Sequence, residues 1–287
     1  MDQLPQYIVN GIAVGSIIAL AAVGLTLSLG ILRLSNFAHG DFMTLGAYFT
    51  WITNKTGLNI WLSMIVGAIG TIITMLISEK LIWQPMRIKR TNATTLTIIS
   101  IGLALFLRNG ISLIWSSNNQ SYNLPVAPPI DILGVKIPIY RLLLVMLSII
   151  VMIGLHFILQ KTKIGKAMRA VADDIDLAKV TGIDVDQVVI WTWIIIGILT
   201  AIGGAMFGLP PTDVRPNMGW FLLLPIFASV ILGGIGNPYG AIAGAMIIGI
   251  TQEVSVIWLG SQYKLAVALV IMMLMLLFRP QGLFKMN

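Results

Sequence analysis

The sequence predicts an all-α protein, a polytopic bundle of transmembrane helices. Hydrophobic residues make up 57% of its 287 residues and charged residues only 10%, whereas a soluble domain carries about 25% charged residues. The mean hydropathy is +0.92. Crossing a bilayer takes about 20 largely apolar residues, and charge-free runs of that size lie at 3–32, 56–78, 142–160, 187–212 and 216–252. Such a chain requires lipid as its solvent.

These runs resolve into eight or nine hydrophobic spans, some of them interrupted. They lie near residues 8–31, 38–54, 60–82, 95–115, 140–160, 188–209, 220–233, 238–259 and 263–279. The first is expected to be retained and not cleaved as a signal peptide, because no Lys or Arg precedes it. A polar, proline-containing outer loop covers 116–139, and no linker separates a second domain. We therefore expect one transmembrane domain over residues 1–287.

Basic residues are distributed unevenly between the two ends of the spans. If nine spans cross with the N-terminus outside, the inner loops hold twelve Lys and Arg and the outer segments five. Cytoplasmic loops of membrane proteins carry such an excess, so the loop at 161–187 is expected in the cytoplasm. The net charge of +7 is then mainly an orientation signal. It points to membrane lipid and not to nucleic acid.

The loop at 161–187 gathers five basic and five acidic residues. Its apolar residues recur at steps of four and three, the spacing of one helical face. They are Ile164, Met168, Val171, Ile175 and Ala178. We expect one amphipathic helix that stops at Gly182, with Asp184 or Asp186 capping the next span. Two interpretations stay open: a helix lying on anionic headgroups, or a coupling helix that docks on an ATP-hydrolysing partner.

Two polar, glycine-containing segments interrupt the spans. Broken backbone at membrane depth must be satisfied by protein or by a water-filled cavity. Interrupted segments in the two halves of a transporter point to its translocation path. The alternative is a tight turn between closely packed helices. The breaks are residues 33–41, with Asn36, His39 and Gly40, and residues 233–238, with Gly233 and Gly234.

A few ionisable residues lie within or beside the spans. Glu253 is about 15 residues into its helix, a costly depth that favours the bundle interior or a cavity, unless the helix ends early and the residue nears the outer interface. Arg108 has the same two interpretations, because its side chain can reach the interface. Asp41 suits the N-terminal end of the helix that follows it. His39 is expected to be structural, since no second metal ligand lies near it.

Enzyme chemistry finds no support in the sequence. There is no G-x-x-x-x-G-K-[ST] pattern, so the chain cannot bind ATP by that route itself. It contains no cysteine, which excludes disulfides, thiolate metal sites and cysteine nucleophiles. We expect no enzymatic activity, no cofactor and no metal.

Four segments carry more specific patterns. They are Gly24 to Asp41, with Asn36-Phe37-Ala38-His39-Gly40-Asp41; Arg169-Ala170-Val171-Ala172-Asp173-Asp174 with Ala178 and Gly182; Ile231 to Ala241 around Gly233-Gly234-Ile235-Gly236-Asn237-Pro238; and Phe278-Arg279-Pro280-Gln281-Gly282-Leu283-Phe284. Together they resemble the family of branched-chain amino acid ABC permeases of the LivH type. The resemblance follows the family's order over nearly the whole chain.

The resemblance implies an ABC importer permease that crosses the bacterial inner membrane several times and carries a branched-chain or other neutral amino acid. It implies three kinds of partner: ABC ATPase subunits, a second, LivM-like permease subunit and a periplasmic substrate-binding protein. It favours the coupling-helix interpretation and supports the two breaks as parts of the path. We expect the ATPase contact at Arg169, Asp174, Ala178 and Gly182, and the path at or near Asn36, His39, Gly40, Gly233, Gly234 and Glu253.

Other functions remain as alternatives. Related permeases carry urea or short-chain amides, so the motifs leave the cargo open. An ion-coupled secondary transporter would use Asp41 and Glu253 as its ion or proton sites. A membrane assembly subunit without transport is a third class. The last two do not explain the charged loop at 161–187.

Overall fold

The computed structural model describes residues 4–125, 128–132, 135–210 and 212–284, which form a bundle of helices. The helices are α1 (Leu4–Gly30), α2 (His39–Lys55), α3 (Ile60–Ser78), the π-helical η1 (Glu79–Trp83), α4 (Gln84–Ile88), α5 (Ala93–Trp115), α6 (Ile139–Lys161), α7 (Lys163–Asp173), α8 (Ile175–Val180), α9 (Val185–Phe207), α10 (Met218–Gly233), α11 (Pro238–Leu259), the 3-10 helix η2 (Ser261–Tyr263) and α12 (Lys264–Phe278). Two short strands, β1 (Ile130–Ile132) and β2 (Val135–Ile137), pair antiparallel.

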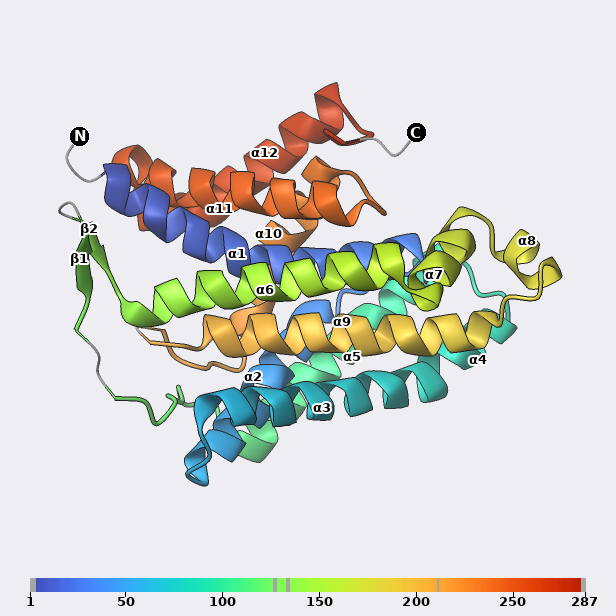
Figure 1. Cartoon of the computed structure of the whole chain (residues 1–287), viewed down its shortest axis with the longest axis horizontal. Coiled ribbons are helices and arrows are strands. Elements are labelled where there is room, and N and C mark those ends of the chain that lie inside the picture. Colours follow the sequence, from blue (N-terminus) through green and yellow to red (C-terminus); the bar gives the residue numbers. More distant parts are fainter. Residues whose placement is uncertain (1–3, 126–127, 133–134, 211, 285–287) are drawn as a thin grey trace.

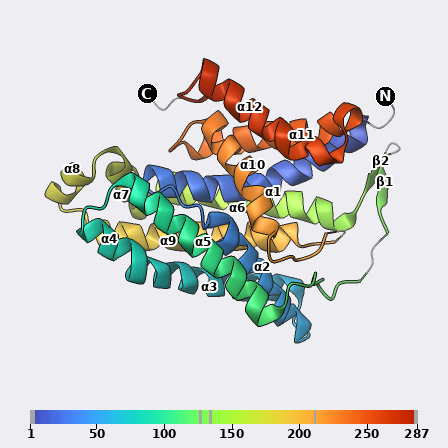
Figure 2. The ribbon, with the colours of Figure 1, turned by 180° about the vertical axis from the view of Figure 1, so that it is seen from behind.

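The long helices run side by side along one axis of the molecule (Figure 1). One end, which we call the outer end, carries the N-terminus and the β1–β2 hairpin. The opposite, inner end carries α4, α7 and α8. Helix α1 is central and packs against α6, α9, α10 and α11. The view from behind shows α10 running obliquely beside α5 and α2 (Figure 2).

The predicted transmembrane bundle is confirmed. Seven helices of the described chain are long and apolar enough to cross a membrane, and α10 is a shorter apolar helix. Each of the nine predicted spans corresponds to a helix, with α2 and α10 as the two short ones. The largest difference at a boundary is at α3, which continues through η1 and α4 to Ile88. Pro85 does not stop it, because its helix, α4, follows directly on the π-helical η1, where the α-helical hydrogen-bond pattern is already interrupted.

The outer loop is more ordered than the sequence suggested. Residues 130–132 and 135–137 pair as two antiparallel strands, in which Ile130 pairs with Ile137 and Asp131 with Lys136. The hairpin is tied to α1, because the Lys136 backbone N–H donates to Gln6 Oε1 at 3.0 Å. The all-α class therefore describes the membrane bundle, and the two strands belong to its outer rim.

The prediction of one continuous amphipathic helix after the fifth span was wrong. The chain forms α7 and α8, and Asp174 between them is extended, with φ −150° and ψ 112°. Its carboxylate accepts hydrogen bonds from the backbone N–H groups of Asp176 and Leu177. Asp is among the best helix N-caps, because it satisfies N–H groups that have no partner within the helix. The cap therefore starts a second helix, although the apolar periodicity of the sequence runs through this position without a break.

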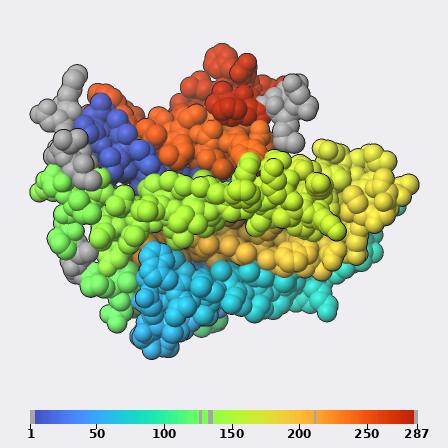
Figure 3. Space-filling model, viewed as in Figure 1, coloured from blue at the N-terminus to red at the C-terminus, as the bar shows by residue number. Residues whose placement is uncertain are grey.

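The sides of α5, α6 and α12 that face away from the bundle are apolar. Phe106, Ile150 and Phe278 are each more than half exposed, as expected for side chains that face lipid or another membrane subunit. In the space-filling view α6 forms a continuous band across one face, between α11 and α9 (Figure 3).

Candidate functional site

The first break places the start of α2 inside the bundle. Helix α1 ends at Gly30, and the chain turns back before α2 begins at His39. The His39 Nε2 atom lies 2.9 Å from the carbonyl oxygen of Ala21. Ala21 is nine residues before the end of α1, or about 13 Å at 1.5 Å per residue. The N-terminal end of α2 therefore lies at the depth of the membrane interior.

Protein groups satisfy the backbone of this break. The Leu34 N–H donates to the Ser28 carbonyl at 3.1 Å, and the Ser28 hydroxyl donates to the Leu34 carbonyl at 3.0 Å. The Phe37 N–H donates to Ser100 Oγ of α5 at 3.1 Å, and this hydroxyl lies 3.2 Å from the Ser35 carbonyl. Irregular backbone at membrane depth is tolerated only with such partners. The break is thus built into the bundle by α1 and α5.

Asn36 and His39 are fully buried at this break. Asn36 Oδ1 accepts a hydrogen bond from the Ala38 N–H at 3.1 Å. Within the described chain, Asn36 Nδ2 and His39 Nδ1 have no hydrogen-bond partner. Buried polar atoms in that state are uncommon, and they distinguish the break from an ordinary packed turn. The assignment of both residues to the path stays a prediction.

Helix α10 crosses α2 at Gly40. A Cβ atom at Gly40 would collide with the carbonyl oxygen of Gly219, and one at Gly219 with that of Gly40. The Gly219 N–H also donates to Thr44 Oγ1 at 3.0 Å. The two short helices of the bundle therefore touch backbone to backbone near the N-terminus of each.

Asp41 and Arg108 form an ion pair that the sequence analysis did not predict. Arg108 Nε lies 2.9 Å from Asp41 Oδ1, and Nη2 lies 3.0 Å from Oδ2. The Asp41 side chain is fully buried, whereas that of Arg108 is 19% exposed. The guanidinium carbon also lies 4.4 Å from the ring centroid of Trp220. Arg108 therefore joins α5 to α2 and α10 and does not snorkel to the interface.

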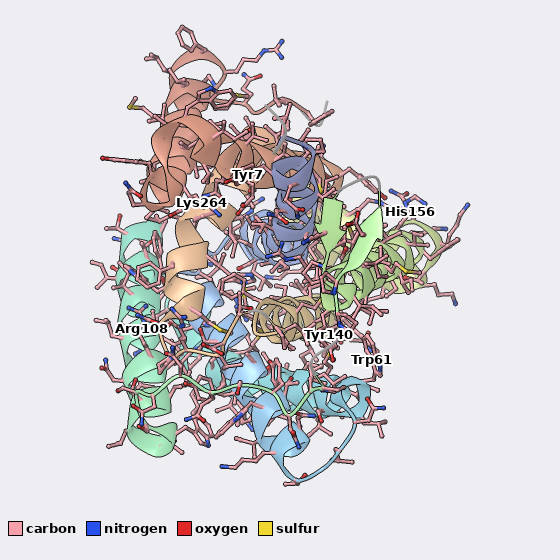
Figure 4. The ribbon with its side chains drawn as sticks, turned by 90° about the vertical axis from the view of Figure 1, so that its left-hand side faces the viewer. Tyr7, Trp61, Arg108, Tyr140, His156 and Lys264 are labelled. Atoms are coloured by element: carbon pink, nitrogen blue, oxygen red, sulfur yellow. The ribbon has the colours of Figure 1, made fainter. Side chains whose placement is uncertain are left out.

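Arg108 of this pair lines a cavity at the outer end of the bundle. The cavity has a volume of about 550 Å³ and is lined by residues of α5 and the loop after it, by residues of α10 and the loop before it, and by Phe207 of α9. Its wall is mixed, with Asn109, Ser112 and Asn217 among the polar residues and Phe207 and Phe221 among the apolar ones. Figure 4 looks at the outer end and shows Arg108 on α5 beside α10. A mixed wall of this kind suits a small ligand with polar and apolar parts.

The second break is a close contact between α10 and α11. A Cβ atom at Gly233 would collide with the carbonyl group of Gly240. Gly234 has a φ of +104°, which L side chains rarely adopt. The Asn237 side chain then accepts from the N–H groups of Tyr239 and Gly240, each at 3.1 Å, and starts α11. The structure places Gly233 and Gly234 in helix packing, and their role in the path stays a prediction.

The C-terminal segment returns to this second break. The Leu283 N–H donates to the Leu232 carbonyl at 2.8 Å, and the Phe284 N–H donates to the Gly233 carbonyl at 3.3 Å. The Asn237 side chain donates to the Phe284 carbonyl at 3.0 Å. The bonds from Leu283 and Phe284 satisfy carbonyl groups at the end of α10, which have no partner within the helix. Two of the four motif segments thus meet in one structural unit.

Glu253 pairs with Lys264 and not with its neighbours in α11. The Lys264 ammonium contacts Glu253 Oε1, and the Gln252 side chain donates to the Lys264 carbonyl at 3.0 Å. The Glu253 side chain is largely buried, and that of Lys264 is one-third exposed. Glu253 lies six residues before the end of α11, near the outer end of the bundle. The pair ties α11 to α12 there.

The four candidate residues for the ATPase contact do not share one surface. Arg169 donates a hydrogen bond to the Leu159 carbonyl, at the end of α6. Asp174 caps α8, and the N–H groups of Leu177 and Asp176 lower the pKa of its carboxyl, with the charge of Arg33 as a smaller cause. Both residues are exposed at the inner end. Each therefore stabilises the shape of α7 and α8 as well as being available to a partner.

Ala178 and Gly182 lie on different sides of this unit. Ala178 is buried against the bundle, together with the predicted apolar face, whereas Gly182 is exposed and has a φ of +86°. Two residues that the sequence analysis missed face outward from α8: Leu177, 62% exposed, and Val180, 85% exposed. Exposed apolar groups at a polar surface are typical of contact sites. In the sequence, both residues are recognisable as apolar positions that lie outside the helical period of the inward-facing residues.

Glu79 is a buried, charged residue in the inner half of the bundle. Its carboxylate contacts both terminal nitrogens of Arg87 and accepts from Trp193 Nε1 at 2.7 Å. It lies at the start of the π-helical η1, a rare structure that is frequent at functional sites. The group ties the α3–α4 segment to α9. Within the residues described by the structure, no cluster of three or more His, Asp or Glu could hold a metal.

The fold and its two interrupted helices define a class, the multi-pass helical membrane proteins. Within that class the chain belongs to the family described as branched-chain amino acid transport system, permease component, whose model matches residues 7–277.

The chain is similar to two curated relatives over most of its length. It is 30% identical to the high-affinity branched-chain amino acid transport system permease protein BraD of Pseudomonas aeruginosa, over 97% of this chain and 94% of BraD. It is 31% identical to a probable branched-chain amino acid transport permease protein LivH of Methanocaldococcus jannaschii, over 96% of this chain and 90% of that protein. Among solved structures, PsaBC from Streptococcus pneumoniae in complex with Fab has the same fold, with a TM-score of 0.53, 13% identity, and coverage of 98% of this chain and 93% of that chain.

Proposed function

We propose that this chain is the permease subunit of an ABC importer for branched-chain or other neutral amino acids in the bacterial inner membrane. Membership of the permease family carries the proposal. The expected partners are separate ATPase subunits, a LivM-like second permease and a periplasmic substrate-binding protein. The chain itself is expected to form the path and to catalyse no reaction.

The ATPase contact is proposed at the inner end, on α7 and α8. Arg169 and Asp174 hold the shape of this unit, Gly182 ends it, and Ala178 anchors it to the bundle. Leu177 and Val180 would supply the apolar contact, because the buried core of an interface is more apolar than its rim. The unit connects α6 to α9, so a push from a partner would reach α9 directly.

The path is proposed along the face where α2, α5 and α10 meet. The first break, with Asn36, His39 and Gly40, would set the depth at which α2 begins. The second break, with Gly233 and Gly234, would form the inner part, and Glu253 lies farther away near the outer rim. ATP-driven movement of α7 and α8 would then shift the short helices between outward and inward openings.

The experiment measures ATP-dependent uptake. The gene for this chain is co-expressed with its neighbouring genes. Uptake of radiolabelled L-leucine is then measured in right-side-out membrane vesicles and, for comparison, in inverted ones. We expect uptake to stop when ATP is depleted at a maintained ion gradient. Continued uptake without ATP would favour the ion-coupled alternative.

A pair of substitutions tests the docking surface. Leu177→Glu with Val180→Glu is expected to reduce co-purification of the ATPase at least tenfold, because each places a charge in an apolar contact. Ile88→Glu is the matched control, since Ile88 is equally apolar and exposed but lies on α4. Retained ATPase binding in the double variant would show that α8 is not the contact.

A further inference from the structure

Arg108 uses only one edge of its guanidinium group in the ion pair with Asp41. The group is planar and carries five N–H donors in a fork geometry. The Nε and Nη2 atoms face the two Asp41 oxygens at 2.9 and 3.0 Å. No hydrogen bond joins Nη1 to any residue in the described part of the chain. The second edge, Nη1 with the remaining N–H of Nη2, therefore has the geometry to take another carboxylate.

Arg108, which carries this second edge, lies on the wall of the outer cavity. Arg108 lines the cavity of about 550 Å³, which lies in the usual range of roughly 300–1,000 Å³ for small-molecule sites. The Asp41 side chain is buried behind it. The Trp220 ring covers one face of the guanidinium at 4.4 Å. Arg108 is thus accessible from the cavity, whereas Asp41 is not one of its lining residues.

The charges around Arg108 restrict the kind of ligand. Asp41 already neutralises Arg108, so a second carboxylate would leave one uncompensated negative charge at membrane depth, which is costly. A ligand that carries its own cation avoids this cost. A zwitterion is therefore favoured over a simple carboxylic acid. A neutral amide or urea would leave the charged edge without an ionic partner.

The other lining residues fit the remainder of an amino acid. Phe207, Met218 and Phe221 supply apolar surface for a side chain. Asn109 and Asn217 supply carbonyl oxygens that can accept from an ammonium group. The two cations of the wall, Arg108 and Arg215, each lie beside a carboxylate, of Asp41 and Asp213, which lowers their repulsion of an ammonium group. The other charged residues of the wall, Asp213 and Arg215, lie 3.8 Å apart at its exposed rim.

We propose that Arg108 binds the α-carboxylate of a neutral, zwitterionic amino acid in the outer cavity, and that Asp41 is the positioning residue that holds its guanidinium. The inference rests on the proposed import function and narrows its cargo. It separates amino acids from the urea and amides that related permeases carry. It also gives a role to the only ion pair that joins α2 to α5 in the described chain.

The test is direct binding of L-leucine to the full chain, co-expressed with its partner subunits and placed in nanodiscs without the substrate-binding protein. Omitting that protein removes its own selectivity from the result. L-leucine is expected to be displaced by unlabelled L-leucine, but not by L-leucinamide, which lacks the carboxylate, or by 4-methylpentanoate, which lacks the ammonium group. Equal displacement by L-leucinamide or by urea would overturn the proposal, as would an absence of L-leucine binding.

Three variants locate the site. Arg108→Gln with Asp41→Asn removes both charges and leaves no unpaired carboxylate, and it is expected to weaken L-leucine binding at least tenfold, because charge-assisted hydrogen bonds are lost. Arg108→Lys keeps the charge opposite Asp41 but has no second edge, and the same loss is expected. Arg141→Gln is the control, an arginine that bonds Asn10 outside this cavity. If the folded double variant and Arg108→Lys both bind L-leucine within twofold of the wild type, Arg108 is not the site.

The failure of this inference can be told apart from failure of the proposed function. Wild-type uptake of L-leucine that needs ATP and survives in the double variant would overturn the role of Arg108 alone. ATP-independent uptake, or none, by the wild-type assembly would overturn the importer itself.

Discussion

Gly40 of α2 and Gly219 of α10 face each other with no room for a side chain on either. The contact brings together the two short helices at the depth where each begins. Asp41 and Trp220, the next residues along the chain, both contact Arg108. The glycine pair thus sets the distance between the two groups that hold this arginine.

Gly219→Ala is expected to destabilise the protein by about 1–3 kcal/mol, because the added methyl group collides with backbone that cannot move aside. Thermal unfolding in detergent, followed by tryptophan fluorescence, measures the loss. Gly102→Ala on α5 is the control, since a Cβ there meets nothing within 4 Å and alanine is the better helix former. Equal stability of the two variants would contradict the contact.

Trp193→Phe is expected to cost about 1.5–3 kcal/mol of unfolding free energy, the usual contribution of a hydrogen bond to a charged group. It removes the donor 2.7 Å from the buried Glu79. Trp191→Phe is the matched control, because Trp191 is 44% exposed on the same helix. A similar loss in both variants would assign the effect to tryptophan size and not to the bond.

Lys264→Met is expected to destabilise the protein by roughly 1–2 kcal/mol, since it leaves the largely buried Glu253 carboxylate without its partner. Glu253→Gln is expected to cost less. The double variant should cost less than the sum of the two, with a coupling energy of about 1 kcal/mol in a double-mutant cycle. L-leucine uptake is expected to persist in Glu253→Gln, whereas an ion-coupled transporter that uses this residue would lose it.

Asp174→Ala is expected to fray α8, because the two backbone N–H groups lose their acceptor. Asp174→Asn keeps an oxygen in the same place and should retain the helix. The lowered pKa of Asp174 means that the carboxylate stabilises α8 above its ordinary pKa of 3.8, and that this stabilisation is lost as the pH falls through the lowered value. Hydrogen exchange of residues 176–180 in the wild type should therefore accelerate only in acid. In Asp174→Asn the exchange should be independent of pH once its intrinsic pH dependence is subtracted.

Much of the fold could be predicted, because lipid as a solvent leaves few choices. An apolar run of sufficient length must be a helix when no water is present to bond its backbone. The short segments around Gly40 and Gly233 were recognised as interruptions from their glycines and polar residues. The inward-facing apolar positions of α7 and α8, such as Met168 and Val171, followed from their period.

The ion pairs could not be predicted, because they join residues far apart in the sequence. Arg108 and Asp41 are 67 positions apart, and their meeting depends on how α5 packs across α2. The signal available was that each was a charge at membrane depth without a visible partner. Asp174 was misjudged for a different reason. A capping side chain can begin a new helix whose apolar residues keep the spacing of the helix before it. The apolar period of the sequence therefore does not reveal the interruption at Asp174.

The bonds from Leu283 and Phe284 to the end of α10 have a consequence for biogenesis. The ribosome synthesises α10 well before these two residues. The inner end of α10 therefore lacks these hydrogen bonds while α11 and α12 are inserted into the bilayer. Only afterwards can the tail fold back and lock it. Errors in inserting α12 would therefore be felt at the second break, because α10 gains these bonds only after Leu283 and Phe284 have been synthesised.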